Sequence, residues 1–131
     1  MNSAAPAREL FRPRGRALVV LAAAGCAALA GGMYVRYMLI EQPSVGLACQ
    51  AGLATLSCAL RAQAIALFTN SVFGVGAAII ATLNLLRPSL VLFALALAFA
   101  GLGIVLYNIN MAALAVALLV LSLARRAPEP E

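Results

Sequence analysis

Between residues 17 and 124 the chain is almost uncharged. Long apolar runs fill this stretch, and only four charged side chains interrupt them: Arg36, Glu41, Arg61 and Arg87. Over the whole sequence 65% of the residues are hydrophobic and 10% are charged, whereas soluble domains have about 45–50% apolar and about 25% charged residues. Because so few charges cannot make a polar surface, the sequence predicts an integral membrane protein.

The apolar runs predict four membrane spans in a single domain. A transmembrane helix needs about 20 predominantly apolar residues, and candidates lie at about 17–40, 62–86, 89–107 and 109–124. Arg87-Pro88 separates the second run from the third, because proline cannot continue a helix and restricts the residue before it. Asn108 and Asn110 mark the last break, since one helix over 89–124 would be about 54 Å long against about 30 Å of hydrocarbon.

The expected fold is therefore all-α, a four-helix transmembrane bundle. A basic N-terminal tail (1–16) precedes the first span, a loop (41–61) joins the first span to the second, and a C-terminal tail (125–131) follows the last span. Small residues at spacing four, such as Ala24, Ala28 and Gly32, predict close helix contacts, with Ala27 and Gly31 on an adjacent row. Such rows drive helix association in lipid, where burial of leucine does not.

The arginines predict the orientation. With both termini in the cytoplasm, the outer side holds only Arg36 and Arg61, and the cytoplasmic side holds seven arginines: Arg8, Arg12, Arg14, Arg16, Arg87, Arg125 and Arg126. This asymmetry follows the positive-inside rule and places loop 41–61 outside. Rich use of Ala and Arg without Lys or His is typical of a GC-rich bacterial genome. We therefore expect a multi-pass protein of the bacterial inner (cytoplasmic) membrane.

The same residues exclude several function classes. The arginines bracket the spans and form no patch interleaved with aromatic residues, so we expect no nucleic-acid partner. Without His, haem ligation, His-based metal sites and His general-base catalysis are excluded. No catalytic residue, metal site or cofactor is predicted. Proton-coupled carriers such as the small multidrug transporters keep a carboxylate inside a span. No carboxylate lies inside a span here, which argues against a carrier of that kind.

The first apolar run has a second interpretation as a signal peptide. Basic residues precede it, Ala28-Leu29-Ala30 is a cleavage-site-like triplet, and Ala23-Ala24-Gly25-Cys26 resembles a degenerate lipoprotein site. The run continues to Ile40, however, which is longer than a signal peptide needs and favours an uncleaved helix. In that case Cys26 is a small hydrophobic residue.

Cys49 and Cys58 lie in the loop that the topology places outside, where bacterial cysteines usually pair. In one straight helix they would be about 13.5 Å apart on opposite faces, but a disulfide needs Cα atoms within about 7 Å. The chain must fold back between them, and Gly52 is the expected place. The sequence thus predicts a short helical hairpin in the outer loop, clamped by a structural Cys49–Cys58 disulfide. A redox-active pair and two free thiols are the alternatives.

The four-helix thiol oxidoreductases of the vitamin K epoxide reductase kind share four spans and exposed cysteines with this layout. They use a C-x-x-C pair, whereas Cys49 and Cys58 form C-x8-C. The similarity is therefore limited to the four-span layout and does not include the cysteine motif.

Two further polar features are candidate sites. Asn70 lies near the middle of the second span, where an amide needs a partner or water. Its side chain either forms a hydrogen bond to another helix, which would stabilise the bundle by about 0.6 kcal/mol, or contacts a substrate or partner. Arg36, Glu41 and Arg61 are predicted to form a polar cluster at the outer interface.

The predicted function is a non-catalytic scaffold or accessory subunit of a membrane complex. Its partners would be the lipid bilayer and either other membrane subunits or further copies of the chain. One alternative is a membrane thiol-disulfide oxidoreductase that uses Cys49 and Cys58. Another is a small transporter or channel, which a polar cavity reaching Asn70 would favour.

Overall fold

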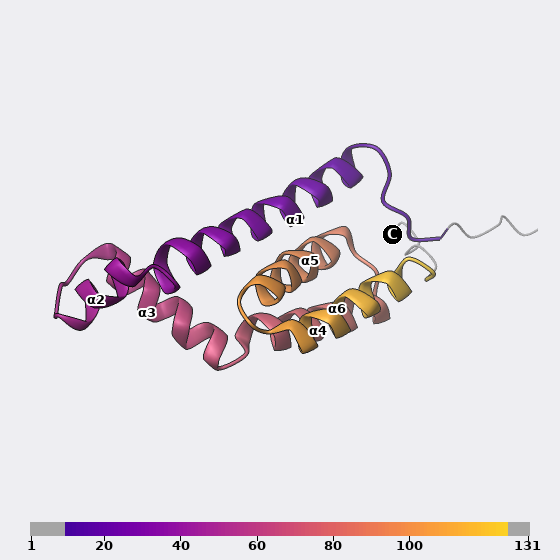
Figure 1. Ribbon diagram of the computed structural model, residues 1–131. Coiled ribbons are helices and arrows are strands. Elements are labelled where there is room, and N and C mark those ends of the chain that lie inside the picture. The colour runs from indigo at the N-terminus through magenta and orange to yellow at the C-terminus, as the bar shows by residue number, and fades with distance from the viewer. Residues whose placement is uncertain (1–9, 126–131) are drawn as a thin grey trace, which may run out of the picture.

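The computed structural model describes residues 10–125. Within this range the secondary structure consists of helices, apart from an isolated bridge residue at Leu10 (Figure 1). The prediction of an all-α chain is confirmed. The helices follow one another as α1 (Arg16–Tyr34), its wider π-helical continuation η1 (Val35–Ile40), α2 (Pro43–Gln50), α3 (Leu56–Thr69), α4 (Val72–Leu86), α5 (Leu90–Val105) and α6 (Ile109–Ser122).

Helices α4, α5 and α6 pack against one another, and α1 packs mainly on α5 (Figure 1). Alanine dominates the core, whose fully buried members include Ala77, Ala81, Ala96, Ala100 and Ala115. Such small side chains let helix backbones approach closely. A Cβ atom added at Gly74 would lie 2.9 Å from the Cβ of Met111, so only glycine fits that crossing of α4 and α6.

The predicted small-residue rows of α1 divide between two faces. A Cβ at Gly32 would lie 3.3 Å from that of Val105, and one at Gly101 would lie 3.5 Å from that of Ala28, so the Ala28–Gly32 row faces α5. Ala27 and Gly31 are exposed, and nothing lies within 4 Å of a Cβ built at Gly31. The second row is therefore uncovered within the described chain.

By length and composition, one described helix is able to cross a membrane. It is the continuous helix Arg16–Ile40, with 25 residues. A second candidate is the pair α3 and α4, whose axes are bent by 56°. A signal sequence or a buried core helix would pass the same test. Helices α5 and α6 are apolar but have only 16 and 14 residues.

The predicted continuous helix 62–86 is wrong. Two helices cover this region, and they meet at a bend at Asn70 and Ser71, where Ser71 adopts a φ of 56°. In an unbroken helix the Gly74 N–H would bond to the carbonyl of Asn70. Here it bonds to Oδ1 of Asn108, 3.2 Å away. A side chain from the α5–α6 turn thus replaces the helical acceptor and stabilises the bend.

The other predicted breaks are present. Helix α4 ends at Leu86, before Arg87-Pro88, and α6 begins at Ile109 after the turn that holds Asn108. The loop 41–61 contains α2 and then the beginning of α3. The second arm of the predicted hairpin is therefore the first turns of a longer helix and not a separate short one.

Candidate functional site

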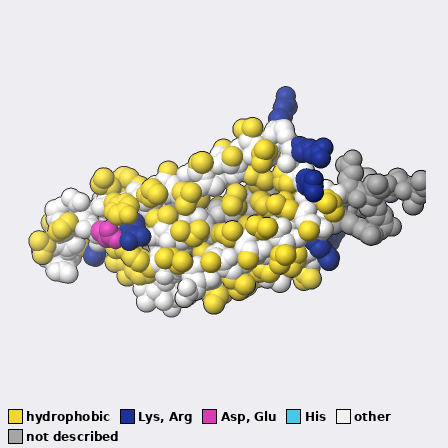
Figure 2. All heavy atoms as spheres, turned by 45° about the vertical axis from the view of Figure 1, so that its right-hand side comes forward, with side chains coloured by type: hydrophobic (Ala, Val, Ile, Leu, Met, Phe, Trp, Pro, Cys, Tyr) yellow, Lys and Arg dark blue, Asp and Glu magenta, His cyan; other side chains and the backbone are white. Residues whose placement is uncertain are grey.

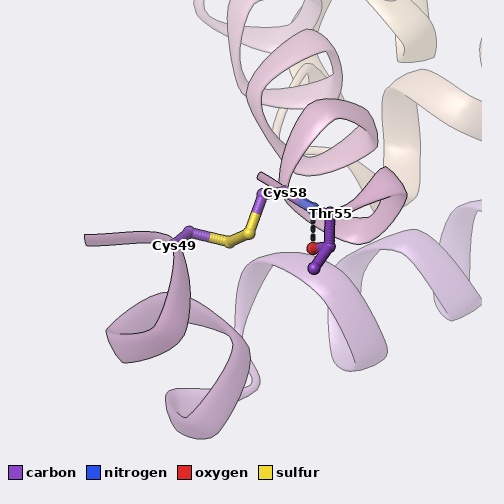
Figure 3. The surroundings of a disulfide bond; sticks show 3 residues. All are labelled: Cys49, Thr55 and Cys58. Atoms are coloured by element: carbon purple, nitrogen blue, oxygen red, sulfur yellow. Dashed lines mark hydrogen bonds between the residues drawn. A yellow bond between two sulfur atoms is a disulfide. The ribbon is translucent and has the colours of Figure 1, made fainter. Parts of the chain in front are cut away.

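The candidate site lies at the end of the molecule that carries α2, which we call the hairpin end. There Cys49, at the end of α2, and Cys58, in the first turn of α3, form a disulfide with Cα atoms 5.4 Å apart (Figure 3). The chain reverses at Gly52, whose φ of 91° is left-handed and suits glycine. The Thr55 hydroxyl accepts a hydrogen bond from the Cys58 N–H at 3.3 Å and caps α3.

Arg36, Glu41 and Tyr107 form a polar cluster that links the end of α1 and η1 to the end of α5. The Arg36 Nε donates to Oε1 of Glu41 at 2.8 Å, and its Nη1 donates to the Val105 carbonyl at 3.0 Å. The Tyr107 hydroxyl donates to the same Glu41 oxygen. The Arg36 guanidinium also lies 4.4 Å from the centre of the Tyr107 ring, within cation–π range.

These contacts lower the pKa of Glu41 below its ordinary value. The hydrogen bond from Tyr107 is the larger cause and the one from Arg36 follows, because both favour the charged carboxylate. Glu41 is solvent-exposed, so the ion pair itself contributes little to stability.

Asn108 is the hub of a second group of contacts, close to the bend between α3 and α4. Its Oδ1 accepts from the Gly74 N–H, and its Nδ2 donates to the carbonyls of Phe68 at 3.1 Å and Leu106 at 3.2 Å. The Phe68 and Tyr107 rings pack with centroids 5.3 Å apart. One buried amide therefore joins the end of α3, the start of α4 and the α5–α6 turn.

Of the three residues predicted to cluster at the outer interface, the structure joins two. Arg36 and Glu41 form an ion pair. Arg61 forms none with Glu41 among the described residues; its guanidinium lies against α2, where a Cβ at Gly46 would be 3.5 Å from its Nη2. The Arg61 Nε is buried without a hydrogen-bond partner.

Asn70 does not have the environment that the sequence indicated. It is exposed at the end of α3, and its Nδ2 donates to the Ala66 carbonyl of its own helix at 2.7 Å. A recess of about 450 Å³ lies beside it, lined by Ser71, Tyr107 and residues 108–111. Asn70 is not among the residues that line this recess.

Sequence reasoning missed the most connected polar side chains. The sequence indicates Asn108 only as a helix break, and it indicates no contact for Tyr107. At the opposite end of the bundle, the fully buried Asn84 donates to the Ser122 hydroxyl at 2.9 Å and accepts from the Ser89 N–H at 3.0 Å. The available signal was an asparagine within or beside an apolar run, since a buried amide needs several partners.

Within residues 10–125, no three His, Cys, Asp or Glu side chains lie close enough together to hold a metal ion. The chain matches no protein-family model, and neither a curated protein nor a solved structure is significantly similar to it.

Proposed function

We propose that this chain is a multi-pass protein of the bacterial inner membrane that acts as a non-catalytic scaffold or accessory subunit. The distribution of side chains supports a membrane setting. On the face that Figure 2 shows, most of the basic side chains gather at one end, the acidic side chain lies toward the other end beside further basic ones, and apolar side chains cover much of the surface between the two ends. The arginine asymmetry favours a cytoplasmic position for both termini.

One observation carries the scaffold role. The row formed by Ala23, Ala27 and Gly31 on α1 is exposed, and α1 packs mainly on α5 through its other face. Residues at spacing four share a helix face, and small side chains at that spacing are the surface over which membrane helices associate. The row therefore offers a contact for another subunit or a second copy.

The test is purification of the intact chain in mild detergent, followed by mass spectrometry of what comes with it. We expect a stable partner or a dimer, and we expect Ala27→Leu to abolish it because leucine keeps the backbones apart. Cys26→Leu is the matched control: Cys26 is exposed as well, about 100° round the helix from Ala27. A monomer without partners, or equal association of both variants, would overturn the role.

The thiol-disulfide oxidoreductase remains the second proposal, favoured by the formed Cys49–Cys58 bond at one end of the molecule. A structural clamp resists mild reductant, so maleimide labels the two cysteines only after the chain has been unfolded in the presence of reductant. A redox pair cycles between labelled and unlabelled forms when quinone and a dithiol are supplied, and it loses turnover in Cys49→Ser. Cys26→Ser serves as the control for the remaining thiol.

A further inference from the structure

The end opposite the hairpin carries a pocket that the proposed function does not use. We call it the arginine end, because Arg12, Arg14, Arg16, Arg87 and Arg125 lie there among the described residues. The pocket has a volume of about 730 Å³, within the roughly 300–1,000 Å³ of small-molecule sites. It is lined by the first turns of α1, by α5, by the end of α6 and by the segment that leads into α1.

Helix α1 and the bundle form the walls. Leu18 and Ala22 of α1 face Phe93 and Leu97 of α5, with Leu123 after α6 completing an apolar lining. Further along, at Gly25, the two helices come into contact, since a Cβ there would be 3.4 Å from the Leu97 side chain. Because Ala22 and Leu97 line the pocket and Gly25 follows Ala22 by about one helical turn, this contact lies beside the pocket on the side of the middle of the molecule.

The segment before α1 closes the other side. The Phe11 N–H donates to the Arg125 carbonyl at 2.8 Å, and the Phe11 ring packs 6.2 Å from that of Phe93, centre to centre. Arg12 follows directly and is the one charged residue among the described residues that line the pocket. The described lining therefore combines apolar side chains with one cation, Arg12.

The positive charge around the pocket favours an anionic ligand. Arg14, Arg16, Arg87 and Arg125 are exposed at this end, and the one carboxylate in the described chain, Glu41, is at the hairpin end. A guanidinium binds phosphate through two parallel hydrogen bonds. Anionic lipids of the cytoplasmic leaflet are attracted to basic side chains beside membrane helices. We propose that this pocket binds an anionic phospholipid, with an acyl chain between α1 and α5 and the phosphate at Arg12.

This inference rests on the proposed membrane setting but not on the association through α1. The test is native mass spectrometry of the full chain in detergent, titrated with phosphatidylglycerol or with phosphatidylcholine of the same acyl chains. We expect phosphatidylglycerol to bind about tenfold more tightly, which corresponds to about 1.4 kcal/mol. Both lipids have a phosphate, but the choline cation of phosphatidylcholine offsets the attraction of its phosphate to Arg12 and is repelled by the other arginines at this end. Arg12→Gln should remove that preference, whereas Arg14→Gln, with the same loss of charge outside the lining, should largely keep it.

A second pair of variants tests the cavity. Ala22→Phe fills it and should abolish binding of both lipids, while Val19→Phe adds bulk at an exposed position outside the lining and should bind normally. Circular dichroism and the intact disulfide show whether each variant is folded. Equal affinity for the two lipids, equal loss in both arginine variants, or displacement by inorganic phosphate alone would overturn the proposal. So would a change in oligomeric mass in Ala22→Phe without loss of lipid, because a second copy would then occupy the pocket.

The two proposals can fail separately. A protein that keeps its partner through Ala27 but binds both lipids equally contradicts only the lipid site. A chain that alkaline carbonate extracts from bacterial membranes contradicts the membrane setting and with it the proposed function.

Discussion

At the scale of single residues, Asn108 makes more side-chain hydrogen bonds than any other described residue. It joins the end of α3, the start of α4 and the turn before α6 through three hydrogen bonds. We expect Asn108→Ala to lower the free energy of unfolding by about 1–3 kcal/mol, because the Gly74 N–H and the Phe68 carbonyl lose their partner in an apolar setting.

Denaturant titration in detergent, followed by circular dichroism, measures this loss. Asn110→Ala is the matched control, since Asn110 is an exposed asparagine two residues further on, in the first turn of α6. Equal losses in the two variants would show that the Asn108 contacts do not stabilise the bend.

Glu41 predicts a small dependence of stability on pH. Its folded-state pKa lies below the ordinary value of 4.5, so the unfolded chain binds the proton more readily. The stabilisation is therefore present above pH 4.5 and is lost as the pH falls through the lower folded-state pKa. We expect the unfolding midpoint of the native chain to fall in that acid range more steeply than that of Glu41→Gln.

Tyr107→Phe removes the larger cause of the shift and should give an intermediate slope. Parallel pH profiles for the native chain and Glu41→Gln would contradict this account of the cluster.

At the scale of elements, two glycines in similar helices have opposite roles. A Cβ at Gly74 would lie 2.9 Å from Met111 and 3.0 Å from the Cβ of Asn108, whereas one at Gly31 meets nothing within 4 Å. We expect Gly74→Ala to destabilise the fold by about 1–3 kcal/mol through overpacking. Gly31→Ala should be neutral or stabilise α1 by up to about 1 kcal/mol, the difference in helix propensity.

Thermal unfolding of both variants in the same detergent measures the contrast. A neutral Gly74→Ala would mean that α4 and α6 are further apart than the structure has them.

The sequence predicts a helix boundary when neighbouring residues cause it, and it does not predict one that depends on a residue distant in sequence. The breaks at Arg87-Pro88 and at Asn108 follow from proline chemistry and from helix length, and both are present. The bend at Asn70 and Ser71 was not predicted, because both residues are tolerated within a helix. Its stabilising partner is Asn108, which is distant in sequence and which only the folded chain brings close. The Arg36–Tyr107 contact was missed for the same reason.

At the scale of the whole molecule, the charge distribution predicts a topology. In a Cys26→Ser background the disulfide leaves no free thiol, so single added cysteines report their side of the membrane. We expect Ser44→Cys, near the start of α2, to react with a membrane-impermeant maleimide in intact cells. Arg14→Cys, at the arginine end, should react only after the inner membrane is permeabilised.

The parent without an added cysteine is the control for background labelling. Labelling of Arg14→Cys in intact cells would contradict the proposed orientation and would place the arginine end outside the cytoplasm.

The packing of α1 on α5 has a consequence for the order of events during synthesis. A ribosome completes α1 first, but α5 emerges only after three further helices, and the Phe11–Arg125 hydrogen bond has to wait for the last described residue. Contacts between distant parts of a chain form slowly because loop closure costs entropy. The first helix therefore waits for its neighbour while residues 35–105 are synthesised, and the face that later packs on α5 stays uncovered by its native partner until the fifth helix arrives.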